Sequence, residues 1–91
     1  MRDITIRAAS AFHFYRNLKL GNTKVVDGKM YLHGNLIAEQ RADGVYITNA
    51  GWFTNVTKER LNGISGVDIV QKNWDWYLND KKWNGEWIRV I

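Results

Sequence analysis

Residues 25–48 read VVDGKMYLHGNLIAEQRADGVYIT, a stretch in which three turn signals separate four short segments. Asp27-Gly28 fits a type I′ hairpin best, because both central residues of that turn need a positive φ. The chain reverses again at His33-Gly34-Asn35 and at Ala42-Asp43-Gly44. This spacing predicts an antiparallel meander of four strands.

The second and third segments of this meander are almost continuously apolar, at Met30-Tyr31-Leu32 and Leu36-Ile37-Ala38. Continuous apolar runs indicate strands that are covered on both faces, or a sheet that curls on itself. Other parts of the chain must therefore supply cover for the sheet.

Two helices are predicted to provide that cover. The first is short and lies near residues 56–63, with a choice of capping residues at its start (Thr54, Asn55 or Thr57) and Gly63 at its end. The second lies near residues 8–20, where apolar side chains recur at helical spacing, although residues 4–7 before it look extended. For residues 8–20 a strand is the alternative.

The C-terminal part continues the antiparallel pattern. Residues 67–71 and 74–78 read as strands joined by a turn at Lys72-Asn73, and residues 86–91 read as a last, alternating strand. In this register Trp74 and Trp76 share a strand face with Leu78, which predicts that both tryptophans point into the core. The predicted fold class is α+β, a mostly antiparallel meander of about six to seven strands with these two helices, in a single domain of residues 1–91.

The inventory of reactive side chains is short. The chain has no cysteine, which excludes disulfides, thiolate metal sites and a cysteine nucleophile. Its two histidines, His13 and His33, have no second ligand at a spacing suited to a metal ion. We therefore expect a protein that is not an enzyme, with no catalytic residue, no metal and no cofactor. A small enzyme that uses converging carboxylates ranks third among the functions considered.

Positive charge and tryptophan are both in excess. The net charge of +4 lies entirely in residues 1–41, which hold seven basic and three acidic side chains. Among the five tryptophans, Trp83 lies between two turn signals beside lysines and is the best candidate for an exposed anchor. Cations together with aromatic rings are what single-stranded nucleic-acid binding requires. The predicted binding residues are Arg16, Lys19, Trp52, Lys58, Arg60 and Trp83.

Three groups of residues resemble a family of small uncharacterised proteins encoded by tailed bacteriophages. They are Leu32-His33-Gly34-Asn35-Leu36-Ile37-Ala38; Ala50-Gly51-Trp52 with Thr54, Thr57, Lys58, Arg60, Leu61 and Asn62; and Trp76-Tyr77-Leu78-Asn79 with Trp83-Asn84-Gly85 and Trp87. The resemblance spans residues 22–91 and leaves the first 21 residues outside. It implies a phage origin and carries no activity over to this chain.

Together these features favour a phage accessory protein that binds a host macromolecule through a basic surface bearing aromatic side chains. The expected partner is nucleic acid, or a host protein that handles nucleic acid or serves in defence. The alternative is a virion structural or assembly protein that self-associates as a homo-oligomer. Because no segment has the apolar core of a signal peptide or the length of a membrane span, we expect no membrane partner and a location in the host cytoplasm.

Overall fold

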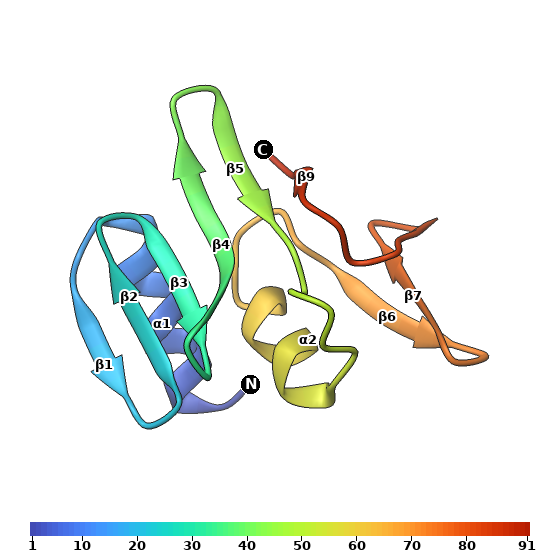
Figure 1. The fold of residues 1–91 in the computed structure, drawn as a ribbon, viewed down its shortest axis with the longest axis horizontal. Helices are drawn as coiled ribbons and strands as arrows, with labels where there is room; N and C mark the ends of the chain where they lie inside the picture. Colours follow the sequence, from blue (N-terminus) through green and yellow to red (C-terminus); the bar gives the residue numbers. More distant parts are fainter.

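Six strands form the larger of two antiparallel sheets in the computed structural model, which describes residues 1–91. Strands β2 to β5 are consecutive neighbours, as the turn signals in residues 25–48 predict (Figure 1). The C-terminal β9 pairs with β5, so the end of the chain extends the meander. The order across the sheet is β1 (Leu18–Leu20), β2 (Thr23–Val26), β3 (Lys29–Leu32), β4 (Asn35–Arg41), β5 (Gly44–Ile47) and β9 (Ile88–Arg89).

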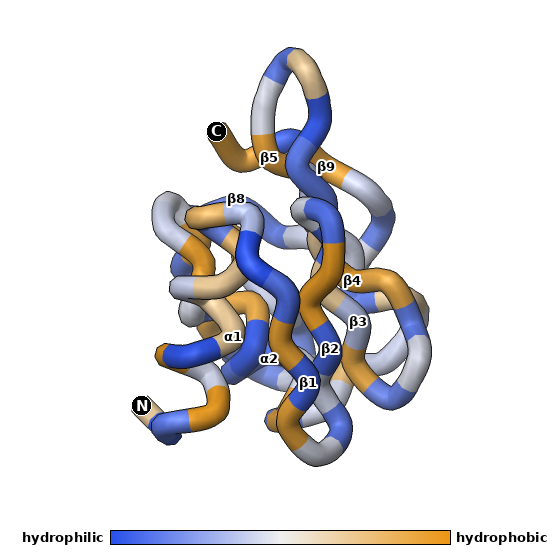
Figure 2. The backbone as a smooth tube through the Cα atoms, turned by 90° about the vertical axis from the view of Figure 1, so that its left-hand side faces the viewer, coloured by the Kyte–Doolittle hydropathy of each residue, from blue (hydrophilic) through white to orange (hydrophobic).

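A β-bulge explains the apolar run in β4. Met30 of β3 pairs with Ala38, and the next residue, Tyr31, pairs with Leu36, so Ile37 is left over between them. Ile37 and Ala38 are both buried, whereas Tyr31 and Leu36 lie half-buried on the other face. The middle of β4 is hydrophobic over consecutive residues for this reason (Figure 2).

Helix α1 (Asp3–His13) packs on one face of β1, β2 and β3. Its buried positions recur every three or four residues, at Thr5, Ala8 and Phe12, which is the stripe expected of a helix on a sheet. The predicted bounds are wrong at both ends, because residues 4–7 are helical and residues 18–20 form β1. Tyr15 takes the chain out of the helix with a φ of +55°, and β1 is held by pairing with β2, which the local pattern of the sequence does not reveal.

Helix α2 (Asn55–Asn62) confirms the short helix predicted near residues 56–63. The Thr54 hydroxyl accepts the Thr57 backbone N–H at 3.2 Å, which satisfies one of the free donors of the first turn. The helix contacts α1 and β6 and lies between the two sheets (Figure 1). One hydrophobic cluster joins buried side chains of both helices and both sheets, among them Phe12, Leu61 and Trp76.

The smaller sheet consists of β6 (Ile69–Lys72), β7 (Asp75–Leu78) and β8 (Lys81–Lys82). The turn between β6 and β7 is at Asn73-Trp74, one residue later than predicted. Trp76 and Leu78 are buried as expected, but Trp74 is 90% exposed, so the prediction that it points into the core is wrong. Pairing of Ile69 with Leu78 sets the register that moves Trp74 out of the strand.

The fold is α+β and mostly antiparallel, as predicted. The structure has nine strands instead of about six to seven, because β1 lies inside the stretch predicted as a helix and β8 is only two residues long. Neither helix is long and apolar enough to cross a membrane.

Candidate functional site

The candidate site is the face of the six-stranded sheet that α1 does not cover. Antiparallel pairing aligns Lys19, Lys24 and Tyr31 across β1, β2 and β3. Because side chains alternate between the two faces of a strand, Arg41 of β4 and Trp87 just before β9 belong to this face as well. A second row across β3, β4, β5 and β9 consists of Lys29, Glu39, Tyr46 and Arg89. We call these nine residues the outer face.

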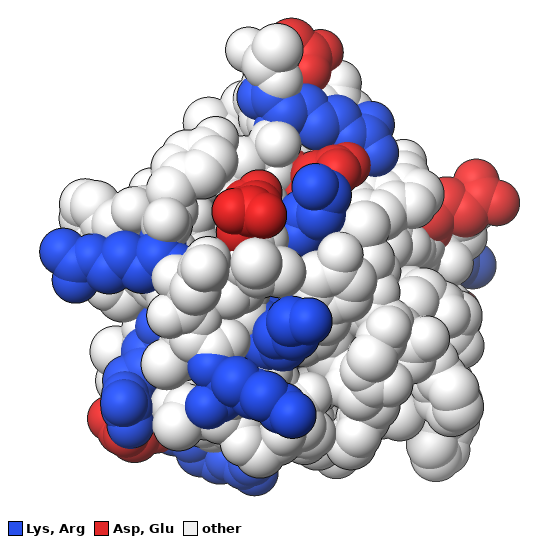
Figure 3. Space-filling model, turned by 60° about the vertical axis from the view of Figure 1, so that its left-hand side comes forward, with Lys and Arg blue, Asp and Glu red and all other residues white.

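The outer face is strongly basic. Its nine residues include five cationic side chains and one carboxylate, that of Glu39, and the Asp43 carboxylate adjoins them at Tyr46. Glu39 accepts from Arg41 Nε at 2.9 Å and lies 4.0 Å from Lys29 Nζ. Lys19 and Lys24 are exposed and have no ion-pair partner. Figure 3 shows Lys and Arg side chains in excess of Asp and Glu on the side of the molecule that includes β1 and β2.

Aromatic rings are interleaved with these cations. The Arg41 guanidinium lies over the Tyr46 ring at 4.1 Å and over the Trp87 ring at 5.1 Å. Lys24 Nζ lies 5.8 Å from the centre of the Tyr31 ring. Contacts in this range are favourable cation–π interactions of about 0.5–1 kcal/mol at exposed sites. Every aromatic ring of the outer face therefore lies beside a positive charge.

A hydrogen bond fixes one of these rings. Tyr46 Oη donates to Asp43 Oδ2 at 2.7 Å. This bond lowers the pKa of the Asp43 carboxyl and raises the pKa of the Tyr46 phenol. At neutral pH Asp43 is therefore anionic and Tyr46 keeps its proton, so the ring is held in place beneath Arg41.

Of the six predicted binding residues, only Lys19 belongs to the outer face. Arg16 is exposed in the segment between α1 and β1, and Lys58 lies on α2, with its Nζ 3.4 Å from Gln71 Oε1. Trp52 is 55% exposed and lines a separate hollow beside the start of α2. The six residues are therefore spread over separate elements.

The prediction that Arg60 lies on the binding surface is wrong, because Arg60 is 0% exposed. Its Nε donates to Thr23 Oγ1 at 3.0 Å, and its Nη1 donates to Thr5 Oγ1 and, at 2.9 Å, to Glu59 Oε1. These bonds join α2 to α1 and β2. Glu59 also accepts from Thr5 at 2.8 Å, which holds the pKa of its carboxyl below the usual range, and Arg2 and Arg60 add to this effect. Nothing in the pattern of a short polar helix indicates this burial, since it arises from neighbours distant in sequence.

The prediction that Trp83 is an exposed anchor is also wrong. Trp83 is 7% exposed, and its Nε1 donates to the Glu86 backbone carbonyl at 2.9 Å. The exposed tryptophans of the C-terminal part are Trp74 and Trp87.

Sequence reasoning missed most of the outer face because it grouped charges by position in the chain and not by strand face. The signal was present in β2, where exposed Lys24 stands between buried Thr23 and Val25. The contributions of Trp87 and Arg89 could not be found this way, because only the pairing of β5 with β9 brings the C-terminus to this sheet.

The histidines and carboxylates form no metal-binding group, since no three or more His, Cys, Asp or Glu side chains could hold an ion together. His13 Nε2 accepts the Ser65 backbone N–H at 3.0 Å. His33 lines two hollows, and neither contains a carboxylate.

Comparison with known proteins identifies a family. The model of the family described as Kyanoviridae Gp96 protein matches residues 1–89. No curated protein and no solved structure matches the chain. The match confirms the phage family expected from the resemblance and corrects its extent, since the first 21 residues lie inside the matched region. The chain therefore belongs to the Kyanoviridae Gp96 protein family, a family of phage proteins.

Proposed function

We propose that this phage protein binds single-stranded nucleic acid on the outer face, as a non-enzymatic accessory protein in the cytoplasm of the host cell. The observation that supports the proposal is the outer face itself, where five cations and three aromatic rings lie together on one open sheet surface. Cations neutralise phosphates, and aromatic rings stack on bases, so both parts of a nucleotide find a partner there.

The preference for a single strand follows from the position of the rings. Tyr31, Tyr46 and Trp87 lie on the surface of the sheet, half-buried or partly exposed, among their cations. Such rings can stack only on bases that are not already stacked and paired in a duplex.

The test is a titration of the protein with a 20-nucleotide single strand, as oligo-dT and as oligo-U, and with a duplex of equal length, across a salt series. If three to five phosphates are neutralised, the logarithm of the binding constant should fall with the logarithm of the salt concentration with a slope of about −2 to −3.5. The single strands should bind more tightly than the duplex.

Matched variants locate the site. Lys19→Gln and Lys24→Gln should each weaken binding and reduce the slope by about 0.7. Arg7→Gln is the control, because Arg7 is an exposed cation on α1, away from the outer face, and its removal changes the net charge equally. Equal effects of all three variants, or the absence of binding at low salt, would refute the proposal. Binding of an acidic host protein without nucleic acid would point to a protein partner, and a stable oligomer in sedimentation without nucleic acid would point to a virion structural or assembly role.

A further inference from the structure

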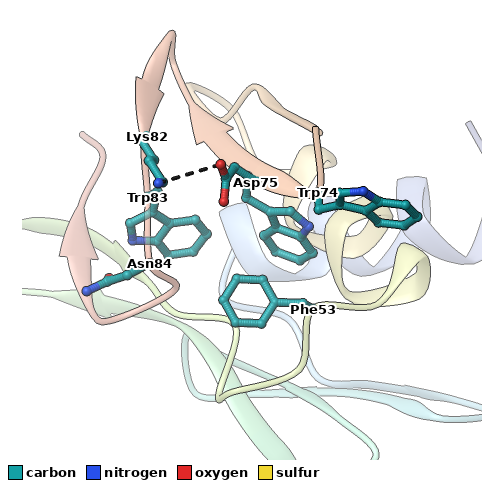
Figure 4. Close-up of a pocket in the computed structure, with 7 residues that line it drawn as sticks. Phe53, Trp74, Asp75, Lys82, Trp83 and Asn84 are labelled. Carbon is teal, nitrogen blue, oxygen red and sulfur yellow. Dashed lines mark ion pairs between the residues drawn. The ribbon is translucent and has the colours of Figure 1, made fainter. Parts of the chain in front are cut away.

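A second aromatic surface lies in the smaller sheet, where a cleft of about 660 Å³ opens beside β7 and β8. Phe53 enters it from the loop before α2 (Figure 4). Three of the five tryptophans line it. We call it the tryptophan cleft, and its lining residues are Phe53, Trp74, Asp75, Trp76, Lys82, Trp83 and Asn84.

The floor of the cleft is a packed set of rings. Phe53 meets Trp76 edge to face, with ring centres 5.1 Å apart, and Trp76 lies 6.3 Å from Trp83 with an angle of 37° between the rings. These rings touch one another, so no ligand fits between them, and a flat ligand would stack on the surface that they form together.

Trp74 lines the cleft at one end of it (Figure 4). It occupies the second position of a two-residue turn with a φ of +74°. Glycine occupies the equivalent position in Asp27-Gly28 and His33-Gly34, where φ is +73° and +80°. A large side chain in this conformation is strained, and this one is 90% exposed and therefore gains little from burial. The fold does not need an indole here, which suggests a role in binding.

The cleft carries no net charge, since Asp75 Oδ2 and Lys82 Nζ pair at 3.5 Å on its wall. No unpaired cation among its lining residues is available for a phosphate, and no unpaired carboxylate is available for a cationic ligand. A neutral ring with polar edges suits these walls, because Asp75, Lys82 and Asn84 offer acceptors and donors around an apolar floor. A nucleobase is such a ring.

Shared lining residues relate the cleft to the outer face. Asn84 lines both the cleft and a neighbouring hollow, and Trp87 lines that hollow as well. Trp87 is in contact with Arg41 of the outer face. The wall of that hollow contains Asn49, which is 1% exposed and whose Nδ2 donor has no partner. A strand leaving the outer face would therefore pass Trp87 and reach the cleft.

We propose that the tryptophan cleft binds unpaired bases of the same single strand whose phosphates lie on the outer face. This inference rests on the proposed function. The outer face provides the charge, and the cleft provides a stacking surface for bases at the end of the strand. Glu86 is the one charged residue of the connecting hollow, and its carboxylate opposes the passage of phosphates there.

The experiment compares wild-type protein with Trp74→Ala and Phe53→Ala in binding to oligo-dT and to an abasic strand with the same number of phosphates. Each substitution should weaken oligo-dT binding about 5- to 150-fold without changing the salt slope. Both should leave binding to the abasic strand unchanged. Glu86→Gln should tighten oligo-dT binding about two- to fivefold. Phe14→Ala is the control, because Phe14 is an exposed ring at the end of α1.

The outcomes separate the two proposals. If wild-type protein binds with the expected salt slope but the cleft variants bind oligo-dT as tightly as wild type, the cleft inference is overturned and the proposed function stands. If wild-type protein binds neither strand at low salt, the proposed function fails, and the inference fails with it. Quenching of tryptophan emission by a neutral oligosaccharide, without quenching by oligo-dT, would assign the cleft to sugars and overturn the inference. Thermal unfolding of each variant verifies that it is folded.

Discussion

Replacing Trp74 by glycine is expected to stabilise the protein, although it removes a large apolar side chain. Trp74 is 90% exposed and holds a φ of +74°, so the substitution removes strain and almost no burial. An L-residue in the left-handed region costs about 1–2 kcal/mol, and the greater unfolded-state entropy of glycine offsets about 0.5–1 kcal/mol of the gain. The net gain of up to about 1.5 kcal/mol should raise Tm by up to about 12 °C in a domain of this size.

Thermal unfolding followed by circular dichroism measures this shift. Trp74→Ala is the control, since alanine keeps the strained conformation and should give no gain. Asp80→Gly tests the same reasoning at a second turn, where Asp80 is exposed and has a φ of +71°. A fall in Tm for Trp74→Gly would refute the reasoning, because it would mean that the indole stabilises the fold through contacts. A gain in stability together with a loss of oligo-dT affinity would show that the strain serves binding.

Three further predictions concern the interior. Arg60→Ala should lower the free energy of unfolding by more than about 2 kcal/mol in urea denaturation, because it leaves Thr5 and Thr23 without their buried donor. Gly85→Ala should lower the free energy of unfolding by about 2 kcal/mol or more, because a Cβ there would lie 2.3 Å from the Asn49 amide at a φ of +89°. Gly34→Ala places its Cβ in open space and should lower the free energy of unfolding by only about 1 kcal/mol. The folded-state pKa of Glu59 lies below its usual value of 4.5, so its contribution to stability is complete above that pH and is lost as the pH falls through the folded-state pKa. Tm measured between pH 7 and pH 3 should therefore fall less steeply in Glu59→Gln than in wild type.

The sequence alone was sufficient to predict the meander, because each of its turns is specified by two or three adjacent residues. Asp27-Gly28 and His33-Gly34 adopt positive φ at both central residues, as the type I′ geometry requires. The capping of α2 by Thr54 is local too, since the hydroxyl and the N–H that it accepts are three residues apart. The excess of positive charge in residues 1–41 is likewise a property of composition, and most of it does lie on the outer face.

The elements that sequence reasoning misplaced depend on partners distant in the chain. Leu18–Leu20 form a strand because they pair with the edge of β2. The helical spacing of apolar residues in this stretch could not reveal that pairing. Trp74 is exposed because the pairing of Ile69 with Leu78 places it in the turn before β7, whereas Trp76 and Leu78 keep the buried face that the sequence predicts.

Burial and assembly of the site were decided by the tertiary structure alone. Arg60 is buried because Thr5 and Thr23, 55 and 37 residues away, supply its acceptors. Trp87 and Arg89 join the outer face because β9 pairs with β5 across the sheet. Composition and local turn chemistry determined that this chain would be a basic, aromatic antiparallel fold. Long-range pairing determined which of its cations and rings lie side by side, since that depends on which strands become neighbours.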